Sequence, residues 1–483
     1  MTTTGAEPLI VIASNRGPFT FKTKKDGTFQ AKRGAGGLVT ALGALAQQYQ
    51  VMWVAAALSK SDRDWALHHP LQTVQGIDLK LITPNKEDYD RYYNVIANPL
   101  LWFIHHGLWE IPRHPLITEA TWQAWQGYIN INRAFAKAIA NSIQDETRPV
   151  IVLPQDYHLY LVPQFLRELV GDAVQIQPFI HIPWPGPDSW RILPAPMRNA
   201  ILISLLHANR VGFQTQKDAF NFVQTCRFYL PDAHSHGSRD SIEYKDKRVQ
   251  ARAYPISVDV EKVLAIANEN QTQLLQNQLM QYIGGRRLIL RVDRIEPSKN
   301  ILRGLEAYRG LLEKYPAYRG KVQMLALLVP SRMEVDEYQT YLKDIMATAG
   351  LINAKFSDEL WEPVRIIVGN NYHRAIAAMQ ISDVLLVNPV ADGMNLVAKE
   401  GALVNARDGV LLLSEFAGAF FEMGDHALTI SPFDIHSTTE AMHRALQMPP
   451  AERHARAEAL RATVKRNNVR HWFENQIQEE AKP

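Results

Sequence analysis

The chain has 483 residues, which is enough for two or three domains that each have a core. Its 52 Lys and Arg residues against 49 Asp and Glu residues give a net charge of only +3, and no basic run is dense enough to indicate a nucleic-acid partner. No stretch approaches the roughly 18 apolar residues of a membrane span, and the first residues lack the basic segment of a signal peptide. Cys226 is the only cysteine, which excludes an intramolecular disulfide, so we expect a cytoplasmic protein.

Short apolar runs alternate with longer amphipathic segments along the chain, which predicts parallel sheets covered by helices. Two sheets fit better than one, with a break near residues 255–259 that follows a polar stretch over 232–247. The segments over 260–282 and from 450 onward are predicted to be helical. The expected buried strands are 9–13, 51–55, 150–153, 177–180, 211–213, 288–292, 323–328, 364–368, 384–387 and 410–413.

A β-hairpin is predicted early in the chain. Two alternating segments, 19–23 and 28–32, flank a Lys-Asp-Gly turn. The glycine-rich run that follows, 34–37, lacks the last glycine of the dinucleotide fingerprint because Val39 stands in its place. The alternative is a glycine loop that lies against a diphosphate, where any Cβ would intrude.

Charged residues follow two predicted strands in the second half of the chain. Arg294 and Lys299 come just after the strand over 288–292, and Asp392 follows the strand over 384–387. An Asp/Gly turn then opens a helix predicted over 396–404, and a helix N-terminus is a ready anion site. Glu400 lies a turn or two into that helix, where its carboxylate could accept hydroxyl groups of a ribose. These segments predict a site that holds a nucleotide sugar and stabilises the departing nucleoside diphosphate.

The same segments resemble the donor site of the trehalose-6-phosphate synthase family, which are retaining glycosyltransferases of the GT-B fold. The resemblance extends from Ser14 to about Glu422, with further matches in family order at 14–16, 36–39, 92–94 with Trp102, 156–159, 181–185, 329–332 with Tyr338, and 414–418. It implies an α/β GT-B fold in which two Rossmann-like domains face a central cleft. We expect an acceptor-binding domain over 1–256, a nucleotide-sugar-binding domain over 257–455, and a C-terminal helix over 456–483 that packs back on the N-terminal domain.

The resemblance also implies a role for individual residues. The residues expected to be catalytic are Asp156, His181, Arg294, Lys299 and Asp392. Those expected to bind the donor are Gly36, Gly37, Arg294, Lys299, Gly393, Met394, Asn395, Leu396, Val397 and Glu400. Those expected to bind a sugar-phosphate acceptor are Arg16, Tyr93, Trp102, Asp156 and Arg332.

The sequence contains no evident serine or cysteine triad and no clear carboxylate nucleophile. Asp62 and Asp64 have the spacing of metal-dependent glycosyltransferases, but no strand precedes them, and we interpret the segment as a solvated turn. We therefore expect neither a metal nor another cofactor. The implied mechanism is front-face retention, in which the acceptor hydroxyl attacks from the side that the diphosphate leaves and the departing phosphate oxygen takes its proton.

The acceptor side departs from the family at one position. Ala56 stands where the family's W-x-G-W has its second tryptophan, which borders the acceptor pocket, so an aromatic side chain is either lost or supplied elsewhere, as Trp184 and Trp190 suggest. The validoxylamine-type pseudo-glycosyltransferases, which join cyclitol units, share this combination, whereas Met394 and Val397 keep the synthase form.

The expected function is an α,α-trehalose-phosphate synthase that transfers glucose with retention from UDP-glucose to glucose 6-phosphate. The sequence does not separate UDP from GDP or ADP donors. An enzymatic alternative uses glycerol 3-phosphate or a cyclitol phosphate as acceptor, and a non-enzymatic alternative is a sugar-phosphate sensor. The partners expected are the nucleotide sugar and the sugar phosphate, without nucleic acid or membrane, and a homo-oligomer is compatible with the sequence.

Overall fold

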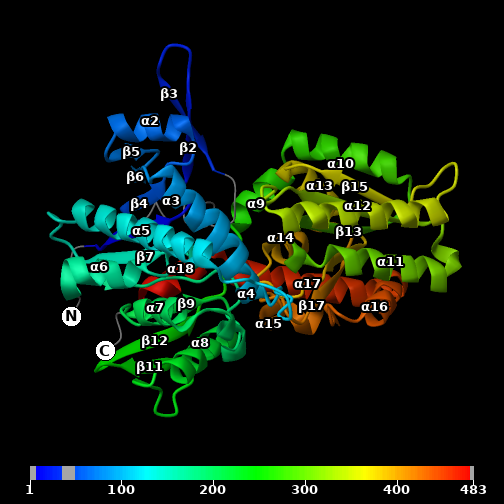
Figure 1. Cartoon of the computed structure of the whole chain (residues 1–483). Helices are drawn as coiled ribbons and strands as arrows, with labels where there is room; N and C mark the ends of the chain where they lie inside the picture. Colours follow the sequence, from blue (N-terminus) through cyan, green and yellow to red (C-terminus); the bar gives the residue numbers. More distant parts are fainter. Residues whose placement is uncertain (1–6, 35–48, 479–483) are drawn as a thin grey trace, which may run out of the picture. The chain divides into compact units, whose positions relative to one another are not determined.

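The computed structural model describes residues 7–34 and 49–478 (Figure 1). The chain divides into two compact units. The first unit ends at Tyr254 and also takes in the chain from Gln476, and the second runs from Pro255 to Asn475. Each unit contains a six-stranded sheet that is covered by helices.

The six-stranded sheet of the first unit has the order β5-β6-β4-β1-β7-β8. Its strands are β1 (Leu9–Ser14), β4 (Val51–Ala56), β5 (Gln72–Val74), β6 (Ile77–Ile82), β7 (Val150–Pro154) and β8 (Gln175–Ile176). All neighbours are parallel except β5 and β6. The strands β1 and β4 are buried along their whole length, which explains why they are continuous apolar runs. The order switches between β1 and β7, and ligands of open α/β sheets bind at such a point.

A four-stranded sheet continues the first unit in the order β10-β11-β12-β9. Its strands are β9 (Arg210–Phe213), β10 (Ala233–His234), β11 (Ser241–Tyr244) and β12 (Lys247–Ala253). The strand predicted over 177–180 is wrong by about two residues, since β8 covers 175–176. Pro178 has no N–H to donate, and pairing continues only as single bridges from Phe179 to Gln155 and Gly212.

The predicted hairpin is confirmed as β2 (Phe19–Thr23) and β3 (Phe29–Arg33), which pair antiparallel. Phe21 stacks on Trp65 of α2 (Lys60–His68) with ring centroids 4.1 Å apart. The interpretation of Asp62 and Asp64 as a solvated turn is wrong. Asp62 lies in the first turn of α2, is buried, and accepts the backbone N–H groups of Ser59 at 2.9 Å and Phe21 at 2.8 Å.

The remaining helices of the first unit include a π-helix. They are α3 (Lys86–Asp90), the π-helix η2 (Arg91–Leu101), α4 (Trp102–His106), α5 (Glu119–Ser142), η3 (Tyr157–Leu159), α6 (Val162–Val170), η4 (Gly171–Ala173), η5 (Pro187–Ile192), α7 (Ala195–Leu205) and α8 (Gln216–Tyr229). Cys226 of α8 is buried and free, as expected for a small apolar side chain in a helix.

The sheet of the second unit is parallel throughout, with the order β15-β14-β13-β16-β17-β18. Its strands are β13 (Arg287–Arg294), β14 (Val322–Val329), β15 (Val364–Val368), β16 (Val384–Val387), β17 (Val410–Ser414) and β18 (Leu428–Ile430). Numbered along the chain, this is the 3-2-1-4-5-6 order of the Rossmann fold. The switch point lies between β13 and β16.

Helices cover both faces of this sheet (Figure 1). The helices described in this unit are α9 (Val260–Ala267), α10 (Asn270–Ile283), η6 (Pro297–Lys299), α11 (Ile301–Lys314), η7 (Pro316–Tyr318), α12 (Asp336–Phe356), α13 (Tyr372–Ile381), α14 (Leu396–Val404), α15 (Phe420–Met423), η8 (Gly424–His426), α16 (Ile435–Gln447) and α17 (Pro450–Arg466). The last helix, α18 (Val469–Gln478), begins in the second unit and ends in the first. The single helix predicted over 260–282 is two helices. The break follows Asn268, whose side chain donates to the carbonyl of Leu264 at 2.9 Å and competes with the backbone.

Candidate functional site

Three of the predicted site residues meet at the switch point of the second sheet. Lys299 lies at the end of η6, and its ammonium group forms an ion pair with the carboxylate of Asp392 beyond β16. The side-chain amide of Asn395 donates to the same carboxylate at 3.0 Å. Two segments that are separated by more than ninety residues in the sequence are therefore joined at the carboxyl ends of neighbouring strands.

The turn over 392–395 is held by the segment that follows β17. Asp392 donates its N–H to the carbonyl of Phe416 at 3.1 Å and accepts the N–H of Gly418 at 3.0 Å. The carbonyl of Met394 accepts the N–H of Ala419 at 2.8 Å. A Cβ on Gly418 would lie 1.8 Å from the carbonyl oxygen of Gly393, so only glycine permits this approach.

Asn395 begins helix α14. Its side-chain oxygen accepts the N–H of Ala398 at 3.1 Å, and its backbone adopts φ 74°. Leu396 and Val397 form the first turn and are half-buried, whereas Gly393 and Met394 are buried. The positive end of the α14 dipole therefore lies beside Lys299, Asp392 and Asn395, where an anionic group is favoured.

Glu296 organises the cations and was not selected from the sequence. One of its oxygens lies 3.2 Å from the guanidinium of Arg294 and 3.2 Å from that of Arg332, and it accepts the hydroxyl of Ser331 at 2.9 Å. Burial alone would raise the pKa of Glu296, but Arg294, Arg332 and Lys299 outweigh burial and lower the pKa to about 2. The carboxylate therefore stays ionised and holds two guanidinium groups together.

The two arginines differ in exposure. The side chain of Arg294 is 50% exposed, so it can still meet a ligand, while that of Arg332 is largely buried and donates to the hydroxyl of Tyr338 at 2.6 Å. Arg332, expected on the acceptor side, thus lies among the cations expected for the donor. The position of Glu296 between Arg294 and Lys299 in the sequence is the signal that would have identified it.

Arg291 holds the loop that carries Lys299. Its buried guanidinium donates to the carbonyls of Lys299 at 3.1 Å and Ile301 at 3.2 Å, and to the side chain of Asn388 at 3.3 Å. The charge of Arg291 is offset by Asp293, 2.9 Å away. This arginine was missed because its sequence context, inside an apolar strand, indicates only a core position.

Several backbone positions at the predicted site are strained. Positive φ angles occur at Asp156 (72°), Asn300 (56°), Arg332 (47°) and Asn395 (74°). Such conformations cost about 1–3 kcal/mol each outside glycine, and they persist where the surrounding structure fixes them. Positive φ angles also occur away from the predicted site, at Gln75, His236, Lys245, Asp246 and Asp408, so the four turns are assigned to the site by their contacts and not by this conformation.

Glu400 is contacted by a tyrosine from the preceding helix. The hydroxyl of Tyr372, the first residue of α13, donates to a carboxylate oxygen of Glu400 at 2.8 Å. Burial raises the pKa of Glu400 to about 7, and the hydrogen bond from Tyr372 lowers it only in part. The ionisation of the predicted ribose-binding carboxylate therefore changes close to neutral pH.

We expect UDP-glucose to bind about tenfold more weakly at pH 6 than at pH 8, because only an ionised Glu400 accepts both ribose hydroxyl groups and the proton competes below its pKa. Isothermal titration of UDP-glucose without acceptor measures this difference, since its diphosphate diester does not titrate in this range. The Glu400→Gln variant is the control, and its affinity should be weaker and independent of pH. Equal wild-type affinity at both pH values would remove Glu400 from the donor site.

In the first unit, Asp156 and His181 lie side by side after β7 and β8. A carboxylate oxygen of Asp156 accepts the backbone N–H of His181 at 3.1 Å. The His181 ring contacts the side-chain oxygen of Gln155 at 2.9 Å and the side-chain nitrogen of Gln214 at 3.4 Å. This pattern assigns the ring proton to Nε2.

Burial lowers the pKa of His181 to about 3, so the ring is neutral at physiological pH. A neutral ring whose two nitrogens contact Gln155 and Gln214 is suited to hold the turn and orient a sugar, not to donate a proton to it. Both glutamines were missed, because neither side chain has a local sequence signal.

Arg16 and Tyr93 are brought together, whereas Trp102 packs deeper. The guanidinium of Arg16 lies 3.5 Å from the hydroxyl of Tyr93. Trp102 is only 4% exposed and stacks on His106 with centroids 4.0 Å apart. The structure therefore favours Arg16 and Tyr93 over Trp102 as groups that a ligand can reach.

Trp184 and Trp190 do not replace the aromatic side chain that is absent at Ala56. Both tryptophans are buried and stack on each other with centroids 4.6 Å apart. Both also pack edge-on against His105. The hypothesis that one of them supplies the exposed aromatic surface is wrong, because the core of the first unit takes up both rings.

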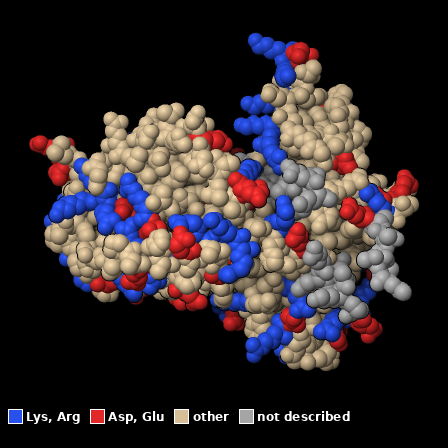
Figure 2. Space-filling view, turned by 180° about the vertical axis from the view of Figure 1, so that it is seen from behind, with Lys and Arg blue, Asp and Glu red and all other residues tan. Residues whose placement is uncertain are grey.

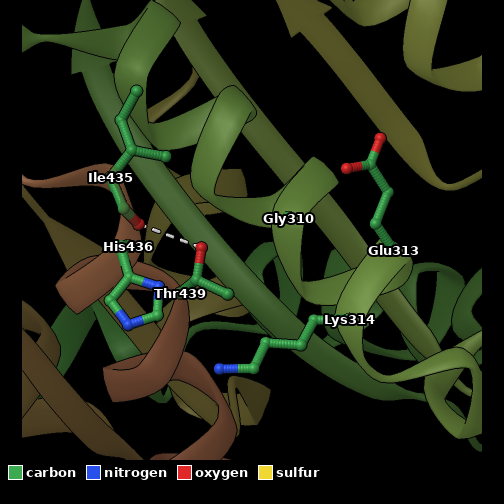
Figure 3. A pocket seen from close by; sticks show the side chains of 6 residues that line it. All are labelled: Gly310, Glu313, Lys314, Ile435, His436 and Thr439. Carbon is green, nitrogen blue, oxygen red and sulfur yellow. Dashed lines mark hydrogen bonds between the residues drawn. The ribbon is translucent and has the colours of Figure 1, made fainter.

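The predicted donor residues Gly36 and Gly37 fall outside the described residues. An open hollow of about 620 Å³ lies between α11 and α16, lined by Gly310, Glu313, Lys314, Ile435, His436 and Thr439, and it contains no predicted site residue (Figure 3). Figure 2 shows basic and acidic side chains mixed over one face of the molecule.

Within residues 7–34 and 49–478, no three His, Cys, Asp or Glu side chains are grouped as a metal ion would need. In the same part of the chain, no helix combines the length and the apolar character needed to cross a bilayer.

Two parallel-sheet units, with cations and strained turns at the switch points, define the fold class of GT-B glycosyltransferases. The chain belongs to glycosyltransferase family 20, whose model matches residues 8–482. It is 30% identical over 97% of its length to a UDP-forming α,α-trehalose-phosphate synthase of Schizosaccharomyces pombe, 90% of which is covered. It is 31% identical over 98% of its length to that of Yarrowia lipolytica, 99% of which is covered.

Two solved structures superpose closely on this chain. "Trehalose-6-phosphate from E. coli bound with UDP-2-fluoro glucose" superposes with a TM-score of 0.86 at 28% identity, covering 98% of this chain and 99% of that one. A UDP-forming α,α-trehalose-phosphate synthase from Burkholderia xenovorans in complex with glucose 6-phosphate gives 0.84 at 27% identity, with 98% and 99% covered. The predicted family and α/β GT-B fold class are confirmed.

Proposed function

We propose that this glycosyltransferase transfers glucose from UDP-glucose to glucose 6-phosphate with retention, forming α,α-trehalose 6-phosphate and UDP. The observation that carries the proposal is the pair of Lys299 and Asp392 at the N-terminus of α14, together with Arg294, which is paired with Glu296 on the loop that carries Lys299. It combines cations for a diphosphate with a carboxylate for sugar hydroxyl groups. The relatives named above, which are UDP-forming synthases of this family, support the choice of substrates.

In this proposal the second unit binds the donor. Arg294 and Lys299 contact the diphosphate and stabilise the charge that grows on it as the glycosidic bond breaks. Asp392 accepts hydroxyl groups of the glucose, and Glu400 those of the ribose. The ion pair between Lys299 and Asp392 holds both groups in place before the donor arrives, so little reorganisation is needed.

The first unit binds the acceptor. Arg16 contacts its phosphate, and Asp156 orients its hydroxyl groups. The acceptor hydroxyl attacks the anomeric carbon from the face that UDP leaves, and its proton passes to the departing phosphate oxygen. The chain supplies alignment and charge, which are the main sources of rate in such a step. The buried, free Cys226 suits a cytoplasmic location, which is part of the proposal.

Mass spectrometry of the products tests this function. UDP-, GDP- and ADP-glucose are each supplied with glucose 6-phosphate, glycerol 3-phosphate or a cyclitol phosphate. A disaccharide phosphate that phosphatase and trehalase convert to glucose would support the synthase. UDP release with another acceptor alone would instead support the altered specificity that Ala56 suggests.

A catalytically silent sugar-phosphate sensor would give no product with any pair. Thermal unfolding then distinguishes it, because a sensor is stabilised by sugar phosphate alone and an enzyme also by UDP.

Activity should survive removal of divalent metal. Arg294 and Lys299, with the N-terminus of α14, supply the positive charge that a metal ion provides in other glycosyltransferases. Initial rates with excess EDTA should stay within about twofold of those with added magnesium, since the leaving diphosphate is already stabilised. Loss of activity in EDTA that magnesium restores would contradict this expectation.

A further inference from the structure

Three aromatic rings form a continuous stack in the first unit. The rings of Tyr89 and Tyr93 are 5.7 Å apart and inclined by 12°, and those of Tyr93 and His158 are 5.8 Å apart and inclined by 16°. The three residues come from α3, η2 and η3, and all are half-buried. Tyr89 is at one end of this stack and has no role in the site described above.

The stack lies beside the loop that follows β1. The hydroxyl of Tyr89 donates to the side-chain oxygen of Asn15 at 3.1 Å, and the next residue, Arg16, contacts the hydroxyl of Tyr93. Asn15 is itself buried, and its carbonyl accepts the N–H of Ala56 at 3.3 Å. Tyr89 and Arg16 are therefore fixed to one short, rigid segment at the switch point of the first sheet.

The π-helix η2 sets the position of Tyr93 between the other two rings. The side chain of Asn98 donates to the carbonyl of Tyr93 at 3.0 Å and accepts the hydroxyl of Tyr157 at 2.7 Å. π-helical segments are uncommon and frequently occur at functional sites. Here the wide turns begin at Arg91, between the two stacked tyrosines.

A cation beside a flat aromatic surface matches a particular class of ligand. A cyclic sugar phosphate offers an anionic group for the guanidinium and a face of C–H groups for the ring, whereas an acyclic phosphate offers only the first. Arg16 is exposed and Tyr89 is half-buried, and both are attached to the loop after β1, Arg16 by the chain and Tyr89 through Asn15.

We propose that Tyr89 is a specificity-determining residue of the acceptor site, where its ring packs against the sugar ring while Arg16 binds the phosphate. The inference rests on the proposed function and adds to it a preference for cyclic over acyclic phosphates. The hydrogen bond to Asn15 and the stacking on Tyr93 hold the ring in one orientation before a ligand binds.

Steady-state kinetics of two variants test the proposal. Tyr89→Ala removes the aromatic surface and should raise the KM for glucose 6-phosphate about tenfold, while kcat and the KM for UDP-glucose stay within about twofold. Tyr89→Phe keeps the ring and should change the acceptor KM by no more than about threefold, because the hydrogen bond that it loses is to Asn15 and not to the ligand. Phe228→Ala, on α8 at a side chain that is 67% exposed, is the matched control and should behave as the wild type.

An unchanged acceptor KM in Tyr89→Ala would overturn the proposal. So would a fall in kcat and melting temperature at constant KM, because that pattern indicates a structural role. A wild type that makes no product from glucose 6-phosphate would contradict the proposed function instead. In that case, the affinities of glucose 6-phosphate and glycerol 3-phosphate are measured separately by isothermal titration, for the wild type and for Tyr89→Ala. The proposed role of Tyr89 requires that the variant lose affinity for the cyclic ligand alone.

Discussion

Replacing Arg294 by alanine should lower kcat by about two to three orders of magnitude, the loss typical of a donor that stabilises transition-state charge. Arg294 is half-exposed, so its guanidinium can bind a diphosphate while it stays paired with Glu296 at 3.2 Å. Lys299 is largely buried and already paired with Asp392. Arg294 is thus better able than Lys299 to strengthen its contact with the leaving phosphate as negative charge grows there.

The protein should remain folded without Arg294, because Glu296 keeps Arg332 at 3.2 Å and the hydroxyl of Ser331. Initial rates at saturating UDP-glucose and glucose 6-phosphate give the effect, with thermal unfolding as a check on folding. Arg309→Ala is a matched control, since this arginine is also about half-exposed and paired with a glutamate, Glu306, on helix α11. A kcat within threefold of the wild type would show that Arg294 does not act on the leaving group.

Replacing Glu422 by alanine should destabilise the protein by about 3–5 kcal/mol, because it leaves a buried lysine without its counter-ion. Lys399 is 1% exposed, and its ammonium group lies 2.5 Å from Glu422 and 2.9 Å from the carbonyl of Ile256. The other oxygen of Glu422 accepts the side chain of Asn467 at 2.8 Å. Chemical denaturation measures the change in the free energy of unfolding.

The pH dependence of the free energy of unfolding gives a second test of the Glu422→Ala variant. Burial lowers the pKa of Lys399, and pairing with Glu422 partly restores it. The unfolded chain therefore binds more protons than the folded one, so stability rises with pH toward the unfolded pKa of about 10.4. Without Glu422 this rise in stability is steeper. The difference in unfolding free energy between the wild type and Glu422→Ala should therefore be smaller at about pH 9.5 than at about pH 7.

Two further variants separate this effect from a general sensitivity to lost ion pairs. Glu440→Ala breaks an exposed pair with Lys314 and should cost much less than Glu422→Ala, because solvent and salt screen an exposed pair. The double variant Lys399→Met/Glu422→Leu should recover much of the stability, since apolar residues can replace a buried pair. A loss in Glu422→Ala no larger than in Glu440→Ala would contradict the expectation.

Most parallel strands were predictable because they are apolar runs, and β1, β4, β7, β16 and β17 are buried along their whole length. The strands β6 and β18 also pair in parallel but were not predicted, since a charged or polar residue interrupts each run. The strands β15 and β16 and the helix α14 have the expected bounds. The strands β10, β11 and β12 were not expected, because they lie in or beside a polar, charged stretch whose pairing is antiparallel and partly exposed. Their pairing depends on the neighbouring strand β9, which no local pattern reveals.

The residues of the candidate site also divide into those that the sequence identified and those that it did not. Residues that follow a buried strand, such as Arg294 and Asp392, were found from position and resemblance. Arg291 and Gln214 were not, because each acts through a partner that only the fold brings close. Glu296 was also missed, although its position between Arg294 and Lys299 was visible in the sequence. Tyr89 is the clearest case, since its hydrogen-bond partner Asn15 lies 74 residues earlier in the chain, just after β1. The site assignments themselves remain predictions that the variants above test.

The close approach of Gly418 to Gly393 has a consequence for protein engineering. Because no side chain fits between them, the two segments must be exchanged together in a chimera, although a helix and a strand separate them in sequence. A chimera that transplants residues 392–400 from a relative with another donor preference should fold well only if residues 414–419 come from the same parent. Recombination libraries that place a crossover between these segments would therefore lose most of their functional members.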